Sequence, residues 1–283
     1  MPYLDRYYQS DDGLRLYARD YPGPAPDAPC VLCLPGLTRN SKDFAALAEH
    51  LSAHYRVLCP DQRGRGHSAR DADLSRYRPD RYAADMLTLL DLLKVERVSI
   101  VGTSLGGLMA MLLVAMAGPR VQAIVLNDVG PELDPRGIAR IAGYVGRASG
   151  PCSLDEAIDR IAAINADCFP DYTRADWLNM VMATCIAEGE QVLLDYDPGI
   201  AEGLASGSAT PNLWPLFDML GARPVLALRG EHSDILAPAT LAAMGARLPQ
   251  IQTLEIPGRG HAPTLDEPQA RQAITDFLAH SHA

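Results

Sequence analysis

Short apolar segments alternate with helical patterns along most of the chain. The apolar runs have the length and composition of buried strands, and the segments between them place apolar residues at helical spacing, as Phe44, Leu47, Ala48 and Leu51 do. From these patterns we expect strands at 30–36, 55–61, 98–102, 121–128, 223–230 and 251–258, and helices at 41–54, 79–95, 104–118, 238–249 and 267–282.

This alternation predicts an α/β fold with a mainly parallel sheet and helices on both of its faces. The first two β-like segments, 5–9 and 14–21, differ because only the turn sequence Ser10-Asp11-Asp12-Gly13 separates them. A short connection rich in turn formers predicts a hairpin. The sheet should therefore begin with an antiparallel edge.

The alternation stops between Asp128 and Trp214. Three helical patterns follow one another there, at 135–147, 153–169 and 173–189, and Ser153 with Glu156 forms a capping box at the start of the second. We therefore expect a core domain made of residues 1–129 and 216–283, with a helical cap at 130–215 inserted into it.

The insertion also carries many of the large apolar side chains of the chain. Most of them should form the core of the cap, and a few should face the crevice that the cap closes, which would favour a substrate with an apolar portion. The candidates are Tyr144, Trp177, Met180, Met182, Trp214, Phe217 and Met219.

Composition excludes several classes of function. The 283 residues carry a formal net charge of −10, which disfavours nucleic acids and anionic membranes as partners.

The polar N-terminus lacks a secretory signal, and the longest apolar stretch, 108–118, is too short to span a bilayer, so we expect a cytoplasmic protein. Cys30 and Cys33 form a C-x-x-C within a predicted strand, but no second cysteine or histidine pair has finger spacing, so we expect buried thiols and no metal site.

The stretch Gly102-Thr103-Ser104-Leu105-Gly106 joins a predicted strand to a predicted helix. This G-x-S-x-G pattern is typical of a nucleophile elbow, in which glycines let the strand and helix approach and expose the serine hydroxyl on a strained turn. The backbone N–H of Leu105, at the start of the helix, could stabilise an oxyanion that forms beside Ser104. The alternative is an ordinary strand–helix turn that ends in an N-cap serine.

A serine nucleophile needs a base to accept its proton and an acid to orient that base. Asp234 and His261 follow the last two predicted strands, and the carboxyl ends of parallel strands are where such sheets place their ligands. The order Ser104, Asp234, His261 is that of a hydrolase triad. Asp128, which ends an earlier strand, is the alternative acid.

The whole chain resembles the α/β-hydrolase fold family of serine hydrolases. The resemblance rests on LPGLTRN, DQRGRGHS, GTSLGG, RGEHSD and GRGHAPTLDEP, which begin at residues 34, 61, 102, 229 and 258. It implies a mostly parallel sheet of the eight-stranded type and assigns a second oxyanion donor, the backbone N–H of Leu37. Pro35 stands where the family commonly has histidine, but the donor is a backbone group and is retained.

This resemblance implies a hydrolase that cleaves a carboxylic ester or lactone and needs neither a metal nor an organic cofactor. Hydrolysis of a carbon–carbon bond in a ring-cleavage product uses the same constellation and is the alternative reaction. A ligand receptor with slow turnover is the non-enzymatic alternative. The motifs alone do not separate the ester, lactone and carbon–carbon substrates.

Arg39 lies two residues beyond the proposed donor Leu37. Its guanidinium could bind a substrate carboxylate, or it could brace the oxyanion loop against a nearby carboxylate or carbonyl. We expect the bracing role. The neighbouring string Arg63-Gly64-Arg65-Gly66 is interpreted as a structured loop, because an acidic chain is a poor candidate for binding nucleic acid.

Overall fold

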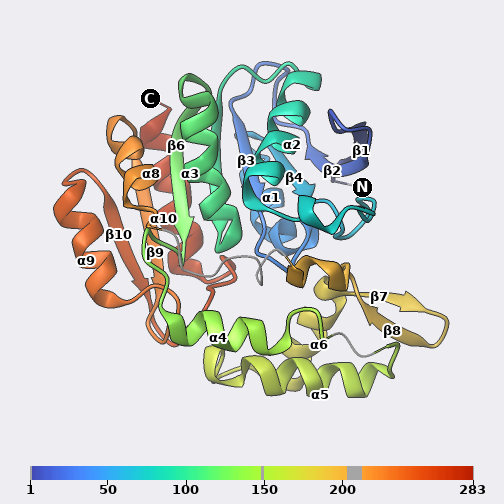
Figure 1. Cartoon of the computed structure of the whole chain (residues 1–283). Helices are drawn as coiled ribbons and strands as arrows, with labels where there is room; N and C mark the ends of the chain where they lie inside the picture. The colour runs from blue at the N-terminus through green and yellow to red at the C-terminus, as the bar shows by residue number, and fades with distance from the viewer. Residues whose placement is uncertain (1, 148–149, 203–211, 283) are drawn as a thin grey trace.

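The core of the protein is one twisted sheet of eight strands (Figure 1). The computed structural model describes residues 2–147, 150–202 and 212–282. The strands lie in the order β1-β2-β4-β3-β5-β6-β9-β10, with β1 and β2 antiparallel at one edge and all pairs from β4 to β10 parallel. The predicted α/β-hydrolase sheet and its antiparallel edge are therefore confirmed. The strands are β1 (Leu4–Gln9), β2 (Arg15–Tyr21), β3 (Cys30–Leu34), β4 (Arg56–Asp61), β5 (Val98–Thr103), β6 (Val121–Asn127), β9 (Val225–Gly230) and β10 (Gln252–Ile256).

The central strand β3 is apolar throughout because helices cover both faces of the sheet. All five residues of β3 are buried, and they point alternately to the two faces. Cys30, Leu32 and Leu34 join one hydrophobic cluster, whereas Val31 and Cys33 join the other. This arrangement explains why the strand reads as a continuous apolar run with no alternation of polar residues.

Two sets of helices, one on each face of the sheet, contribute the remaining side chains of these two hydrophobic clusters (Figure 1). One face is covered by α1 (Ala45–Leu51) and α10 (Pro268–Ser281). The other face is covered by α2 (Pro79–Leu92), α3 (Leu105–Ala117), α8 (Trp214–Asp218) and α9 (Pro238–Arg247).

Among the helices in the described residues, α3 is the most apolar, and it has no charged residue along its length. It packs on β3, β5 and β6, and eight of its thirteen residues are buried. Its apolar character therefore comes from packing against the centre of the sheet. In the described parts of the chain, no helix combines the length and apolar character that crossing a bilayer requires.

The segment that the sequence assigns to the cap lies at the carboxyl end of the parallel strands (Figure 1). It contains α4 (Pro135–Tyr144), α5 (Leu154–Asn165), α6 (Arg174–Thr184), β7 (Cys185–Glu188) and β8 (Gln191–Leu194). It has a hydrophobic cluster of its own, which includes Ile158, Phe169, Trp177 and Val181. The boundaries 130 and 215 stay a prediction.

The predicted helix at 173–189 is wrong in its last part. The helix α6 ends at Thr184, and Cys185–Glu188 form strand β7, which pairs with β8 in an antiparallel hairpin. Gly189 has a positive φ of 62° at the turn, a conformation that glycine adopts without a steric penalty. The cap is therefore not purely helical, although its three predicted helices are present.

The cap is fixed to the core by ion pairs and backbone hydrogen bonds. Asp195, beyond β8, accepts hydrogen bonds from Lys42 Nζ at 2.9 Å and Asn40 Nδ2 at 3.2 Å. The backbone N–H of Gly260 donates to the carbonyl of Cys168 at 2.7 Å. Such contacts hold the cap in one position over the strand ends.

Candidate active site

Ser104 lies on the sharp turn between β5 and α3. Its φ of 52° and ψ of −115° are strained for a residue with a side chain. A Cβ atom at Gly106 would overlap the carbonyl oxygen of Leu34, and one at Gly102 would overlap the backbone of Gly106. The glycines therefore permit the close approach of strand and helix that holds this serine, as the G-x-S-x-G pattern predicted.

Ser104, His261 and Asp128 form one hydrogen-bonded chain. The Nε2 atom of His261 lies 2.8 Å from Ser104 Oγ, and its Nδ1 atom lies 2.8 Å from Asp128 Oδ2. The Asp128 side chain is completely buried. It is held in place by the Ser233 hydroxyl at 2.7 Å and the Gly230 N–H at 2.9 Å, both of which donate to it.

The prediction that Asp234 holds His261 is wrong in this structure. Asp234 receives a two-fold hydrogen bond from Arg140 of α4, with Nε–Oδ2 and Nη2–Oδ1 distances of 2.6 and 2.8 Å. Although burial alone would raise the pKa of Asp234, the hydrogen bonds and charge of Arg140 lower it. Asp234 therefore joins the core to the cap, and the alternative Asp128 takes the position beside the imidazole.

Asp128 contacts His261 in place of Asp234 because of the two loops that follow the neighbouring strands β6 and β9. Strands β6 and β9 pair in parallel, so the residues after both of them arrive at the same edge of the sheet. Asp128 comes directly after β6, whereas Asp234 lies beyond a turn in which the Ser233 N–H bonds to the Gly230 carbonyl. That turn directs the Ser233 hydroxyl to Asp128 and leaves Asp234 facing α4.

The two predicted oxyanion donors flank Ser104. Leu37 is a central residue of a turn that the Arg39 N–H closes on the Gly36 carbonyl, so the turn's own hydrogen bond does not use the Leu37 N–H. A Cβ atom on Gly36 would lie 3.8 Å from Ser104 Cβ, which shows how close this turn comes to the serine. Leu105 is the first residue of α3, where helix N–H groups lack partners within the helix.

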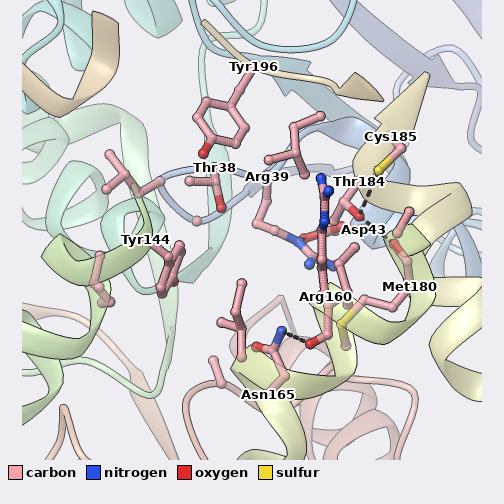
Figure 2. Close-up of a pocket in the computed structure, with 18 of the residues that line it drawn as sticks. Thr38, Arg39, Asp43, Tyr144, Arg160, Asn165, Met180, Thr184, Cys185 and Tyr196 are labelled. Atoms are coloured by element: carbon pink, nitrogen blue, oxygen red, sulfur yellow. Dashed lines mark hydrogen bonds and ion pairs between the residues drawn. The ribbon is translucent and has the colours of Figure 1, made fainter. Parts of the chain in front are cut away.

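A cavity of about 520 Å³ opens above Ser104 and His261, between the core and the cap. Its size is within the range of small-molecule sites. Of the large apolar cap residues singled out from the sequence, Tyr144 and Met180 line it (Figure 2). Trp177 belongs to the core of the cap, and Met182 is 62% exposed.

Comparison with known proteins agrees with this architecture. The family model described as alpha/beta hydrolase fold matches residues 29–268. The chain belongs to the α/β-hydrolase family. A 3-hydroxybutyrate-oligomer hydrolase of Cupriavidus necator is 38% identical over 250 residues, which cover 84% of each chain.

Two further relatives extend over most of this α/β-hydrolase. The crystal structure of an alpha/beta hydrolase from Novosphingobium aromaticivorans has 44% identity and a TM-score of 0.93, with 98% of each chain covered. A 2-(acetamidomethylene)succinate hydrolase of Mesorhizobium japonicum is 26% identical over 88% of each chain.

Arg65 supports the turn that carries Leu37, the predicted oxyanion donor, and the sequence did not reveal this contact. Its side chain is buried, and its Nε donates to the carbonyl oxygen of Leu37 at 2.9 Å. The guanidinium also donates to Tyr82 Oη at 3.0 Å and lies 5.7 Å from the centre of the Tyr77 ring. The glycine-rich string around Arg65 predicted a structured loop but gave no sign of what the arginine would bind.

Arg39 combines features of both roles considered for it. Its Nε donates to Asp43 Oδ2 at 2.6 Å, which is the kind of contact that bracing requires. Its side chain also lines the cavity (Figure 2), which is what substrate binding requires. The position of Arg39 is therefore compatible both with bracing the turn and with binding a substrate carboxylate.

Within the described residues, one group of carboxylates comes close enough together to hold a metal ion: Asp11, Asp12 and Asp85. Arginines already neutralise it, because Arg63 pairs with Asp12 and Asp85, and Arg81 pairs with Asp11 and Asp12. We therefore interpret the group as part of an ion-pair network. All six cysteines are buried and unpaired with one another.

Proposed function

We propose that this hydrolase cleaves a carboxylic ester or lactone through an acyl-enzyme at Ser104. The observation that carries the proposal is the hydrogen-bonded chain from Ser104 through His261 to the buried Asp128, which opens into the cavity under the cap. A serine, a base and an orienting acid at these distances are what nucleophilic catalysis requires.

In the first half of the reaction, Ser104 Oγ attacks the carbonyl carbon while Nε2 of His261 accepts the hydroxyl proton. The Leu37 and Leu105 N–H groups donate hydrogen bonds to the oxyanion of the tetrahedral intermediate. When the intermediate collapses, the bond to the alcohol oxygen breaks and His261 returns the proton to that oxygen. The acyl group is now an ester of Ser104.

In the second half, His261 accepts a proton from a water molecule, whose oxygen attacks the acyl-enzyme. Collapse of this second intermediate releases the carboxylic acid, and His261 returns the proton to Ser104 Oγ. Throughout, we assign to Asp128 the role of holding the Nδ1–H tautomer and stabilising the imidazolium. Asp234, which is paired with Arg140, takes no part in these steps.

The relatives favour an ester as the substrate. The enzyme from Cupriavidus necator is named for oligomers of 3-hydroxybutyrate, in which ester bonds join hydroxy acid units. Apolar residues such as Tyr144, Ile161 and Met180 line the cavity and suit the aliphatic part of such a substrate.

The test is a substrate panel assayed with the wild type and with Ser104→Ala. The panel contains acyl esters of increasing chain length, 3-hydroxybutyrate oligomers, lactones and vinylogous diketones. We expect multiple turnovers of esters by the wild type and a loss of about 10⁴-fold or more in Ser104→Ala, with an unchanged melting temperature. Retention of a tenth of the activity would exclude Ser104 as the nucleophile, and cleavage of diketones alone would indicate the carbon–carbon reaction.

A further inference from the structure

The wall of the cavity is cationic, although the chain as a whole is acidic. The described charged side chains that line it are Arg39, Arg147, Arg160 and Asp43, besides the imidazole of His261. The arginines outnumber the carboxylate three to one, in a chain whose formal net charge is −10. An excess of positive charge in a partly closed cavity attracts an anionic ligand, because low-dielectric walls concentrate the field there.

Arg39 brings one of these charges close to the nucleophile. A Cβ atom on Gly36 would lie 3.5 Å from Arg39 Cγ and 3.8 Å from Ser104 Cβ, so both side chains begin beside the same point. The hydrogen bond to Asp43 engages the Nε–H, which is one of the five N–H donors of a guanidinium. Burial disfavours the charge on Arg39, but the Asp43 carboxylate outweighs this effect and raises the pKa of Arg39.

Arg160 brings a second charge from the cap. It lies on α5, and its side chain reaches into the same pocket as that of Arg39 (Figure 2). Together with Arg147, these two arginines outnumber the single carboxylate, Asp43, among the described charged side chains of the wall. Arginine forks match the two oxygens of a carboxylate and bind them with charge-assisted hydrogen bonds.

We propose that Arg39 and Arg160 bind a free carboxylate on the substrate, a few covalent bonds away from the scissile carbonyl. The substrate class is then a short ester or lactone that bears a carboxylate, such as an ester-linked hydroxy acid with a free acid end. This inference rests on the proposed function, since it names the substrate of the same site. It also gives the cavity two parts, an apolar part for the chain and a cationic part for its acid group.

The test compares two substrates that differ only in this charge. They are the linear dimer of 3-hydroxybutyrate as the free acid and the same dimer with a carboxamide at its acid end. We expect the wild type to show a kcat/KM at least roughly tenfold higher for the acid, since hydrogen bonds to charged groups are about twice as strong as neutral ones. Equal values for the two dimers would overturn the proposal.

Arg160→Met isolates the contribution of the cap arginine, because Arg160 does not belong to the oxyanion turn as Arg39 does. The acid-to-amide ratio of kcat/KM should fall by roughly 10- to 100-fold in this variant. The matched control is Arg174→Met, which removes a cap arginine that is 56% exposed and paired with Asp155 and Asp159. A ratio that falls equally in both variants would indicate a general effect of charge and would contradict the proposal.

A binding measurement separates this inference from the proposed function. Ser104→Ala retains the arginines, so glutarate should bind to it in calorimetry and should bind at least tenfold more weakly to the Ser104→Ala, Arg160→Lys double variant, in which lysine loses the fork. If glutarate binds but no ester is cleaved, the proposed function fails and the carboxylate site stands. If esters are cleaved and glutarate does not bind, the carboxylate site fails.

Discussion

The side chain of Asp128 contacts three different residues around the candidate site. Its carboxylate accepts hydrogen bonds from the Gly230 N–H and the Ser233 hydroxyl and contacts Nδ1 of His261. The first two partners, Gly230 and Ser233, hold the carboxylate in the position from which it contacts the imidazole. An acid held in this way orients the histidine by geometry as well as by charge.

A pair of amide variants distinguishes the two carboxylates. Asp128→Asn should lower kcat by roughly 10⁴-fold, because an amide in this position favours the wrong imidazole tautomer. Asp234→Asn should leave most of kcat and lower the melting temperature, because it weakens the contact between Arg140 and the core. Steady-state kinetics and thermal melts measure the two effects, and the reverse ranking of kcat would restore Asp234 as the acid.

Ser104 and His261 could be predicted because each lies within a short glycine-containing motif that can be recognised in the sequence itself. The acid could not be predicted in this way, because Asp128 and Asp234 both lie at the carboxyl end of the parallel strands. What separates them is the conformation of a short turn and the presence of Arg140, which lies 94 residues away from Asp234. No local pattern encodes a contact of that kind.

At the scale of elements, the turn between β5 and α3 requires glycine at position 106, because there is no room for a Cβ atom there. Gly106→Ala would force a Cβ atom into the Leu34 carbonyl and so push the helix away from β3. We expect a loss of about 1–3 kcal/mol in the free energy of unfolding, as for other overpacked sites, together with reduced kcat. Chemical denaturation measures the first quantity and ester hydrolysis the second.

Gly245→Ala is the matched control for this variant. Gly245 lies in α9, and a Cβ atom there would have no neighbour within 4 Å. Alanine is the better helix former, so this substitution should stabilise the protein by about 0.5–1 kcal/mol. If Gly106→Ala were equally harmless, the close packing of strand and helix would not be what requires glycine at that position.

The elements of the core were predictable because their patterns are local and strong. Apolar runs of strand length alternate with helical periods, and parallel strands buried on both faces leave this signature. The hairpin of the cap was missed because Cys185–Glu188 continue the helical pattern of α6 without a break. Its pairing with β8 depends on the turn at Gly189.

On the scale of the whole molecule, a buried arginine connects distant parts of the core. The side chain of Arg63 is fully buried and pairs with Asp71 at 2.5 Å, Asp85 at 2.6 Å and Asp12 at 3.1 Å. These partners come from the hairpin between β1 and β2, from a loop and from α2. The pairs neutralise a charge that would otherwise be costly to bury.

This network predicts how stability depends on pH. Burial would raise the pKa of Asp12, but Arg63 and Ser10 lower it from its ordinary value of 3.8 to about 2. A carboxylate with a lowered pKa in the folded state stabilises that state at pH values above about 4, and this contribution is lost as the pH falls towards 2. The stabilisation is roughly 1 kcal/mol once partial exposure is allowed for.

Asp12→Asn should therefore be less stable than the wild type at pH 7, and the difference should disappear between pH 4 and pH 2. Urea denaturation at a series of pH values measures it. Asp27→Asn changes an exposed loop residue and serves as the control, with an expected effect below about 0.5 kcal/mol at every pH. A difference for Asp12→Asn that stays constant down to pH 2 would exclude an electrostatic origin.

The two carboxylates beside His261 have a consequence for how such enzymes diverge. Asp128, directly after β6, forms a hydrogen bond with the imidazole, while Asp234 on the loop after β9 is close enough for its charge to interact with that of His261. A descendant that loses Arg140 and Ser233 would release Asp234 and loosen Asp128 in the same step. The position of the acid can thus change from the end of one strand to the end of the next, while every intermediate protein keeps a carboxylate near the histidine. Two hydrolases that place the acid after different strands can therefore still share a common ancestor.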